Sequence, residues 1–182
     1  MPRRRQIALS GAALTAALLI LTWLAAFHVG PLVRADEKIF SGFLDLHRGR
    51  IHSLATFTAQ LCDPQPYVYF ALLPPLIALV RRRFAIAVAV SAMLLGASVT
   101  THLLKPLLAH TRADALLGGT TLPVAAASWP SGHATAAMAL ALAFVLVVPA
   151  RLRPATATVG ALFAIAVSYS FLTLGWHYPS DV

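Results

Sequence analysis

Residues 81–104 read RRRFAIAVAVSAMLLGASVTTHLL, three arginines followed by an apolar run from Phe84 to Leu104. A run of about 20 apolar residues can cross the hydrocarbon core of a bilayer as an α-helix. A helix suits that setting because it pairs its backbone N–H and C=O groups within its own segment. Arginines gathered at one end mark the cytoplasmic side. This stretch therefore predicts a transmembrane helix that starts at the cytoplasmic surface.

The remainder of the chain contains more long apolar runs. Of its 182 residues, 59% are hydrophobic and 11% are charged, and the mean hydropathy is +0.77. Soluble domains carry about 25% charged residues, so this composition is typical of a membrane protein. Further spans are predicted at residues 7–29, 67–80, 133–148 and 156–174. The predicted fold is all-α: a polytopic membrane helical bundle of about five transmembrane helices, forming one domain over residues 1–182.

The formal net charge of +8 could indicate nucleic-acid binding, but the positions of the basic residues argue against it. The arginines cluster before the first span and in alternate connections between later spans, whereas the acidic residues lie in other segments. These arginines are Arg3, Arg4, Arg5, Arg81, Arg82, Arg83, Arg151 and Arg153. Such alternation is the positive-inside pattern. We therefore expect no nucleic-acid partner, a cytoplasmic N-terminus, and residues 30–66, 105–132 and 175–182 on the outer face.

Residues 31–66 have a mixed character. Apolar side chains recur there at roughly helical spacing among Asp, Arg and His, which predicts an outer amphipathic segment on the membrane face or capping the bundle. They are Ile39, Phe40, Phe43, Leu44, Ile51, Leu54 and Phe57. The lone cysteine, Cys62, forms no internal disulfide and is predicted to be a small apolar filler.

One polar cluster on the predicted outer face is Trp129-Pro130-Ser131-Gly132-His133. Ser131 is a good N-cap, and Gly132 allows the backbone to approach a ligand closely. A helix N-terminus binds phosphate through its free N–H groups and dipole, and His133 could donate a proton to a leaving oxygen. Taken alone, the cluster is weak evidence, and a capped helix start that carries an incidental histidine is the favoured alternative.

Two more clusters fall on the same face. His177 and Asp181 suit a nucleophile and the carboxylate that orients it, although a polar turn after a span is the alternative. Lys105 and Arg112 could clamp an anionic head group, or could be snorkelling residues at the membrane interface. A metal site is not predicted, because the histidines form no H-x-x-x-H or H-E-x-x-H pair; the scattered candidates are His102, His110, His133, His177 and Asp181.

In this order, the clusters resemble the phosphatidic acid phosphatase type 2 family of the acid phosphatase/vanadium haloperoxidase-like superfamily. Its pattern is K-x6-R-P, then P-S-G-H, then S-R-x5-H-x3-D. The matching residues are Lys105, Arg112, Pro130, Ser131, Gly132, His133, Ser170, His177 and Asp181, and the resemblance covers roughly residues 60 to 182.

The resemblance implies that His177 attacks phosphorus to form a phosphohistidine, that Asp181 orients His177, and that His133 protonates the leaving group. It implies that phosphate oxygens are held by four residues, which are Lys105, Arg112, Ser131 and Gly132. No metal or other cofactor is implied. The expected substrate is a lipid phosphate such as phosphatidate, phosphatidylglycerol phosphate or undecaprenyl diphosphate. The expected place is the outer face of a bacterial cytoplasmic (inner) membrane.

The chain departs from the family pattern in three places. Ala113 replaces a proline, and Phe171 replaces the arginine of the third motif, which removes a bidentate phosphate donor. Arg48 and Arg50 lie on the same predicted side and are candidate replacements. The family's membrane members continue into a sixth span at the motif aspartate, and this chain ends at Val182, so we expect a bundle without that helix.

Two other functions stay open at this point. A lipid phosphotransferase would pass the same phosphoryl group to a lipid hydroxyl. A catalytically inactive lipid-binding membrane protein is favoured by Phe171 and by the missing last helix, and is opposed by the presence of His133, His177 and Asp181. Oligomeric state is not predicted.

Overall fold

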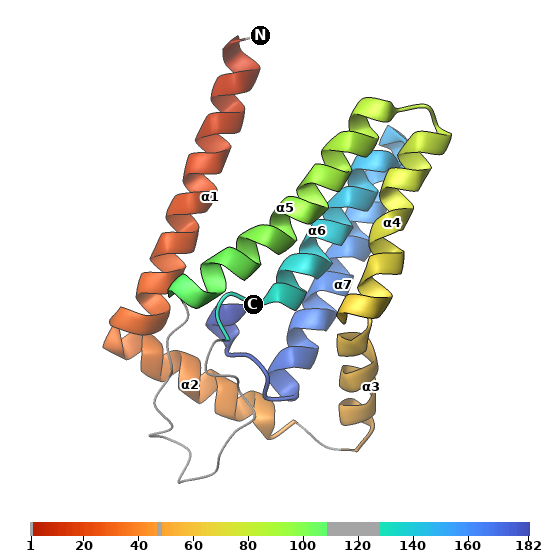
Figure 1. Ribbon diagram of the computed structural model, residues 1–182. Helices are drawn as coiled ribbons and strands as arrows, with labels where there is room; N and C mark the ends of the chain where they lie inside the picture. The colour runs from red at the N-terminus through yellow and green to blue at the C-terminus, as the bar shows by residue number, and fades with distance from the viewer. Residues whose placement is uncertain (1, 47–48, 109–127) are drawn as a thin grey trace.

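The computed structural model describes residues 2–46, 49–108 and 128–182, and every regular element in them is a helix (Figure 1). The helices are α1 (Pro2–His28), α2 (Gly30–Leu44), α3 (Gly49–Gln60), α4 (Pro64–Val80), α5 (Phe84–Leu108), α6 (Gly132–Val147), η1 (Ala150–Leu152), α7 (Arg153–Thr173) and η2 (Pro179–Asp181). This confirms the predicted all-α membrane fold.

Five of these helices are apolar enough to belong in a membrane. Three stretches are also long enough to cross one: Arg5–His28, Phe84–Leu108 and Ala150–Thr173. Pro64–Val80 and Gly132–Val147 are shorter apolar helices. Each of the five overlaps a span expected from the sequence, and the exact membrane limits of each stay a prediction. Pro74 and Pro75 do not end α4, which continues as a helix through both prolines.

The bundle has a basic end and a motif end. Arg81, Arg82 and Arg83 form the turn from α4 to α5, and Arg151 lies in η1 between α6 and α7. Both connections lie at the same end of the bundle as the start of α1 (Figure 1). Arg81 Nη1 donates a hydrogen bond of 3.1 Å to the carbonyl of Val147, which ties the two basic connections together. The last residues of α5 and α7 and the first residues of α6 lie at the opposite end (Figure 1).

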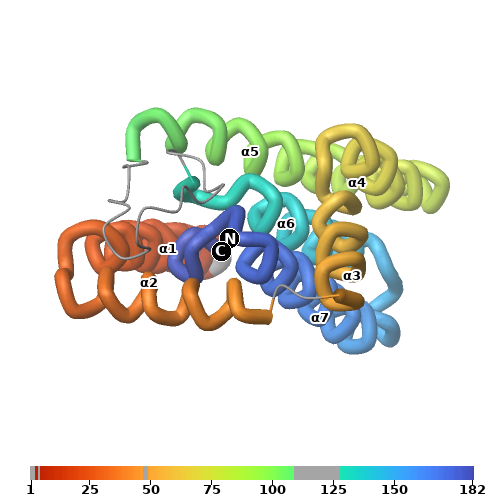
Figure 2. The backbone as a smooth tube through the Cα atoms, turned by 90° about the horizontal axis from the view of Figure 1, so that it is seen from below, coloured from red at the N-terminus to blue at the C-terminus, as the bar shows by residue number. Residues whose placement is uncertain are grey.

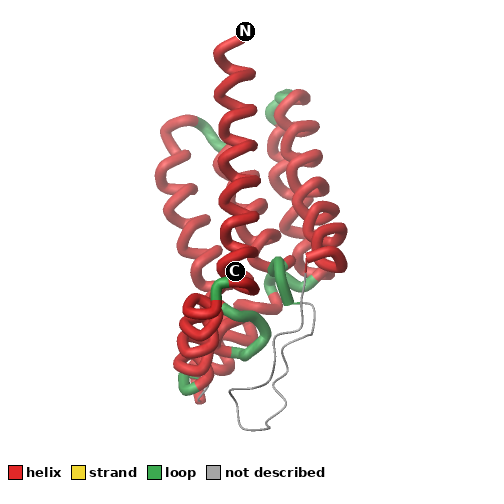
Figure 3. The backbone as a smooth tube through the Cα atoms, turned by 90° about the vertical axis from the view of Figure 1, so that its left-hand side faces the viewer, coloured by secondary structure: helices red, strands yellow, loops and turns green. Residues whose placement is uncertain are grey.

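Helix α6 is the centre of the bundle. It packs against α4, α5 and α7, and its buried residues are mostly alanines, which allow the neighbouring helices to approach closely. One apolar cluster joins α4, α5 and α6, and a second joins α3, α6 and α7. By contrast, α1 stands apart from the other apolar helices over most of its length (Figure 1) and lies nearest the viewer when the bundle is seen from that side (Figure 3).

The segment expected to be amphipathic forms α2, α3 and the turn that leads into α4. Helix α2 lies across the motif end of the bundle, where it packs against α1, α7 and η2 (Figure 2). It buries Asp36 and Phe40, while α3 buries Ala55 and Ala59 against α7. Helix α2 therefore covers the end of the bundle that carries the motifs, and α3 flanks α7 at that end (Figure 1). Their location at the outer membrane surface stays a prediction.

The contact between α6 and α7 gives a first testable prediction. Replacing Gly160 with alanine should lower the free energy of unfolding by about 1–3 kcal/mol, the usual cost of overpacking. The added Cβ would lie 2.7 Å from Ala141 Cβ and 3.3 Å from Ala141 Cα, so the two helices would have to separate. Unfolding in mixed detergent micelles with increasing SDS measures the change.

The matched control is Gly96→Ala in α5, where an added Cβ meets nothing within 4 Å. That variant should be as stable as the parent protein or slightly more stable, because alanine favours a helix over glycine by about 1 kcal/mol. Equal destabilisation by the two substitutions would contradict the close α6–α7 contact.

Candidate active site

The third motif begins where α7 ends in a glycine turn. Gly175 has φ of 74°, the left-handed conformation that glycine adopts without a steric penalty. The N–H of Trp176 donates to the carbonyl of Phe171 at 2.9 Å, and the N–H of Gly175 donates to that of Leu172 at 3.2 Å. This pairing is the Schellman motif, which ends a helix and reverses the chain. The reversal carries His177 back to the end of the bundle.

His177 and Asp181 form a buried pair. His177 Nδ1 lies 3.4 Å from Asp181 Oδ2, and the two residues are 7% and 6% exposed. The same carboxylate oxygen accepts the backbone N–H of Tyr178 at 2.9 Å, so the carboxylate is held independently of the histidine. A carboxylate on Nδ1 fixes the ring orientation and leaves Nε2 as the nitrogen available for reaction. The structure therefore brings His177 and Asp181 together, and their roles as nucleophile and orienter stay a prediction.

Ser131 caps α6 and ties the second motif to the third. Its Oγ accepts the N–H of Ala134 at 3.3 Å, as expected for an N-cap residue. Its own N–H donates to the carbonyl of Asp181 at 2.9 Å, so the start of α6 and η2 are joined directly. An added Cβ on Gly132 would be 3.8 Å from Thr101 Cγ2, an ordinary contact. Packing against neighbouring residues therefore does not require the glycine, and its role in binding phosphate stays a prediction.

His133, in the first turn of α6, has a carboxylate partner of its own. Its Nε2 lies 3.4 Å from Asp63 Oδ1. Lys105 lies in the last turn of α5, which ends at the same end of the bundle as the start of α6 (Figure 1). Of the predicted site residues, the structure thus gathers His133, His177, Asp181, Ser131, Gly132 and Lys105 at one end of the bundle. Arg112 lies outside the described residues, as does Arg48.

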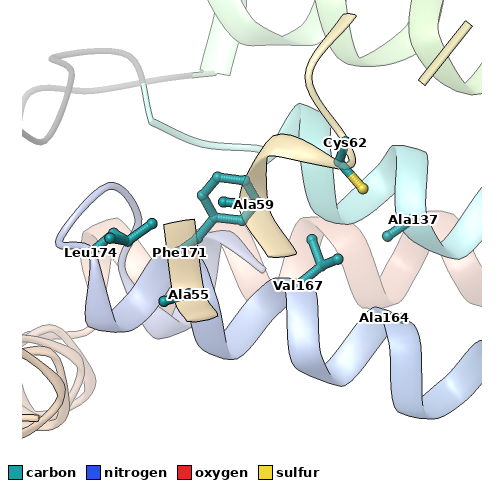
Figure 4. Close-up of a cluster of buried hydrophobic side chains, with 8 residues drawn as sticks. All are labelled: Ala55, Ala59, Cys62, Ala137, Ala164, Val167, Phe171 and Leu174. Carbon is teal, nitrogen blue, oxygen red and sulfur yellow. The ribbon is translucent and has the colours of Figure 1, made fainter. Parts of the chain in front are cut away.

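Phe171 stands at the position of the family's arginine, and its ring packs against the rings of both His133 and His177. It is 0% exposed, and its ring centroid lies 4.6 Å from that of His133 and 5.6 Å from that of His177. Figure 4 shows its ring beside Ala59 of α3, within a cluster that includes Cys62 and Leu174. The other proposed replacement, Arg50, is exposed in the first turn of α3. Phe171 therefore supports the position of both histidines by packing and contributes no charge.

Cys62 is buried in the same cluster, as expected for an apolar filler. Burial, with a smaller contribution from the charge of Asp63, raises the pKa of the Cys62 thiol to about 11. The thiol is therefore protonated near neutral pH, and it is a poor nucleophile because the thiolate is the reactive form. Among the described residues, no three His, Cys, Asp or Glu side chains are grouped as a metal site would need.

Sequence reasoning missed two carboxylates. Asp63 precedes the prolines that open α4 and is its N-cap residue, but its side chain makes no capping bond and meets His133 instead. An Asp-Pro helix start was a visible signal for its position, though not for its partner. Asp36 lies one helical turn before Phe40 on the buried face of α2, and its carboxylate binds Ser180. Only the tertiary structure identifies that contact.

Comparison with known proteins agrees with this arrangement. A profile of the PAP2 superfamily matches residues 82–182, which include all three motifs. A search of curated proteins gave no match. Among solved structures, the chain resembles the crystal structure of the first transmembrane PAP2 type phosphatidylglycerolphosphate phosphatase from Bacillus subtilis, with a TM-score of 0.73 and 19% identity over 91% of this chain and 86% of that one. At that identity the likeness establishes the fold. Because the profile covers more than half of the chain and includes the residues gathered at the site, this protein belongs to the PAP2 superfamily.

Proposed function

We propose that this protein is a phosphatase that hydrolyses a lipid phosphate or prenyl diphosphate through a phosphohistidine, without a metal ion. One observation carries the proposal: the buried His177–Asp181 pair is joined by a backbone hydrogen bond to the capped start of α6, whose first turn contains His133. The residues proposed as nucleophile, orienter, acid and phosphate-binding helix end thus lie together at one end of the bundle. These are the parts that phosphoryl transfer requires.

The reaction would run in two steps. In the first, His177 Nε2 attacks phosphorus, a P–N bond forms, and the P–O bond to the leaving group breaks while His133 supplies the proton that this oxygen gains. In the second, water attacks phosphorus, returns a proton to His133, and releases inorganic phosphate as the P–N bond breaks. Because both steps develop charge on the phosphoryl oxygens, donors fixed in advance accelerate them. We assign that role to Lys105, Arg112, Ser131 and the N–H groups at the start of α6.

The position of the site favours a lipid substrate. It lies at the end of five apolar helices, where a head group can reach polar residues while its tail stays in the bilayer. The basic connections at the opposite end favour a cytoplasmic location for that end by the positive-inside rule, so we place the site on the outer face of a bacterial cytoplasmic membrane. The Bacillus subtilis relative is named as a phosphatidylglycerolphosphate phosphatase. Phosphatidylglycerol phosphate, phosphatidate and undecaprenyl diphosphate are accordingly the first candidates.

Phe171 favours a second candidate function, a catalytically inactive lipid-binding protein. A family arginine would add a bidentate charged donor for the phosphate, and removing one transition-state donor commonly costs on the order of 10²–10³ in rate. The intact His133, His177 and Asp181 oppose this alternative. We therefore expect turnover that is slow for the family rather than absent.

Phosphate release from the three candidate lipids, in detergent micelles containing EDTA, tests the proposal. We expect release from at least one of them at a rate that EDTA does not change. Restored activity on adding a divalent cation after EDTA treatment would contradict the metal-independent mechanism. Transfer of the phosphoryl group to an added lipid alcohol, with no release of free phosphate, would identify a phosphotransferase. If the folded protein reacts with none of the lipids, the inactive lipid-binding protein would be favoured.

A further inference from the structure

Helix α2 places a buried carboxylate against the residue that precedes Asp181. Asp36 is 8% exposed, and its two oxygens both bind Ser180. Oδ1 accepts the backbone N–H of Ser180 at 2.9 Å, and Oδ2 accepts its hydroxyl at 2.7 Å. A buried carboxylate is costly unless it is well hydrogen-bonded, and bonds to an ionised acceptor are about twice as strong as neutral ones. This contact therefore fixes Ser180 tightly to α2.

The same short segment is held from its other side by the loop before α6. Trp129 Nε1 donates to the carbonyl of Ser180 at 3.1 Å, and the N–H of Ser131 donates to the carbonyl of Asp181 at 2.9 Å. Helix η2 is therefore clamped between α2 and the second motif. One turn further along α2, Phe40 packs on Tyr178, with ring centroids 4.5 Å apart. Two side chains on one face of α2 thus cover the residues on either side of Pro179.

The clamped segment is the one that orients the candidate nucleophile. Asp181 directly follows Ser180, and its Oδ2 holds both the N–H of Tyr178 and the Nδ1 side of His177. A shift of η2 would move the carboxylate away from the ring. Misplacement of a reacting group by about 1 Å can cost a factor of 10² in rate.

We propose that Asp36 is a positioning residue: it holds Ser180 so that Asp181 keeps His177 oriented for attack on phosphorus. The catalytic consequence rests on the proposed phosphatase function, whereas the effect on the His177 ring does not. In this arrangement α2 is a structural part of the active site in addition to covering the end of the bundle. Its carboxylate is proposed to act on His177 through Ser180 and Asp181.

The kinetic test compares three variants per mole of folded protein. Asp36→Ala should lower kcat by about tenfold to hundredfold and leave KM within about twofold, because orientation of the nucleophile is lost while substrate contacts remain. Asp36→Asn should restore most of kcat, since its amide can accept the Ser180 N–H and donate to the Ser180 hydroxyl. Asp45→Ala is the matched control, because Asp45 is an exposed aspartate at the end of α2, and its kcat should equal that of the parent protein. An unchanged kcat in Asp36→Ala would overturn the proposal.

A second measurement separates this proposal from the proposed function. In protein labelled with ¹⁵N-histidine, the ring signals of His177 are identified by their loss in His177→Ala. Asp36→Ala should change these signals toward a mixture of tautomers, and Asp36→Asn should restore them, whether or not any lipid is hydrolysed. Identical His177 signals in the parent and Asp36→Ala proteins would overturn the positioning role even if the enzyme is active. If Asp36→Ala does not fold, Ser180→Ala carries both tests, with a lowered kcat and altered ring signals expected and unchanged values overturning the proposal.

Discussion

Replacing His177 with alanine is expected to reduce phosphate release by on the order of 10⁴–10⁶-fold, the range seen when a nucleophile or its base is removed from an enzyme. The imidazole is the group proposed to form the P–N bond, and alanine provides no substitute for it. Both His177 and Asp181 are buried and lie 3.4 Å apart, so the ring is held in place and is not an exposed surface side chain. Release of phosphate from the preferred lipid, measured at saturating substrate, gives the size of the effect.

The same variant tests the covalent intermediate. With lipid labelled in its phosphate, rapid quenching of the parent protein should trap a phosphoenzyme that acid destroys and alkali preserves, as expected for phosphorus bound to a ring nitrogen. His177→Ala should trap none. The matched control is His102→Ala, because His102 is an exposed histidine whose Nδ1 is 2.9 Å from the carbonyl of Ser98 on its own helix. A label that survives in His177→Ala would place the nucleophile at another residue.

Replacing Phe171 with alanine should lower the free energy of unfolding by about 3–5 kcal/mol, the usual cost of removing a buried aromatic ring. The ring is 0% exposed and fills the cluster between α3, α6 and α7 (Figure 4). Its neighbours in that cluster are mostly alanines, which are too short to close the resulting cavity. Equilibrium unfolding of the purified protein in mixed micelles measures the loss.

Two further variants sharpen this prediction. Phe171→Leu should cost less than Phe171→Ala, because leucine fills part of the volume. Phe57→Ala is the matched control, since Phe57 is 63% exposed on α3, and its effect should stay within about 0.5 kcal/mol. If Phe171→Ala were no more destabilising than Phe57→Ala, the packing role of Phe171 would be wrong.

Phe171 also illustrates how a departure from a family pattern acquires physical meaning. From the sequence alone, the phenylalanine means that a charged hydrogen-bond donor to the phosphate is missing. In the structure its ring packs against His133 at 4.6 Å and against Trp176 at 5.4 Å, among small apolar residues. On its other side the ring packs in a cluster of small apolar residues, where a guanidinium without an anionic partner would carry the cost of a buried charge. The surroundings of position 171 are therefore adapted to the phenylalanine.

The amino-acid sequence by itself determined the class of fold and indicated the residues that we propose carry the chemistry. Apolar runs long enough for a bilayer leave the backbone no stable choice but the helix, so the membrane bundle follows from hydropathy alone. Local rules were similarly sufficient at the motifs. Ser131 caps α6 as its residue type predicts. Gly175 adopts the left-handed conformation that ends α7, as glycine commonly does after a helix. The spacing of His177 and Asp181 was enough to predict their pairing.

Tertiary structure alone decided which distant residues contact the motif residues. Asp36 and Ser180 are 144 positions apart, and Asp63 meets His133 across the junction between α4 and α6. Neither pair has a sequence signature, because a single carboxylate on an amphipathic helix looks the same whether it faces water or a partner. Contacts of this kind depend on how the helices are placed relative to one another, and that placement results from the packing of small residues over the whole bundle. Sequence periodicity reports which face of a helix is buried, and only the assembled bundle reports what that face meets.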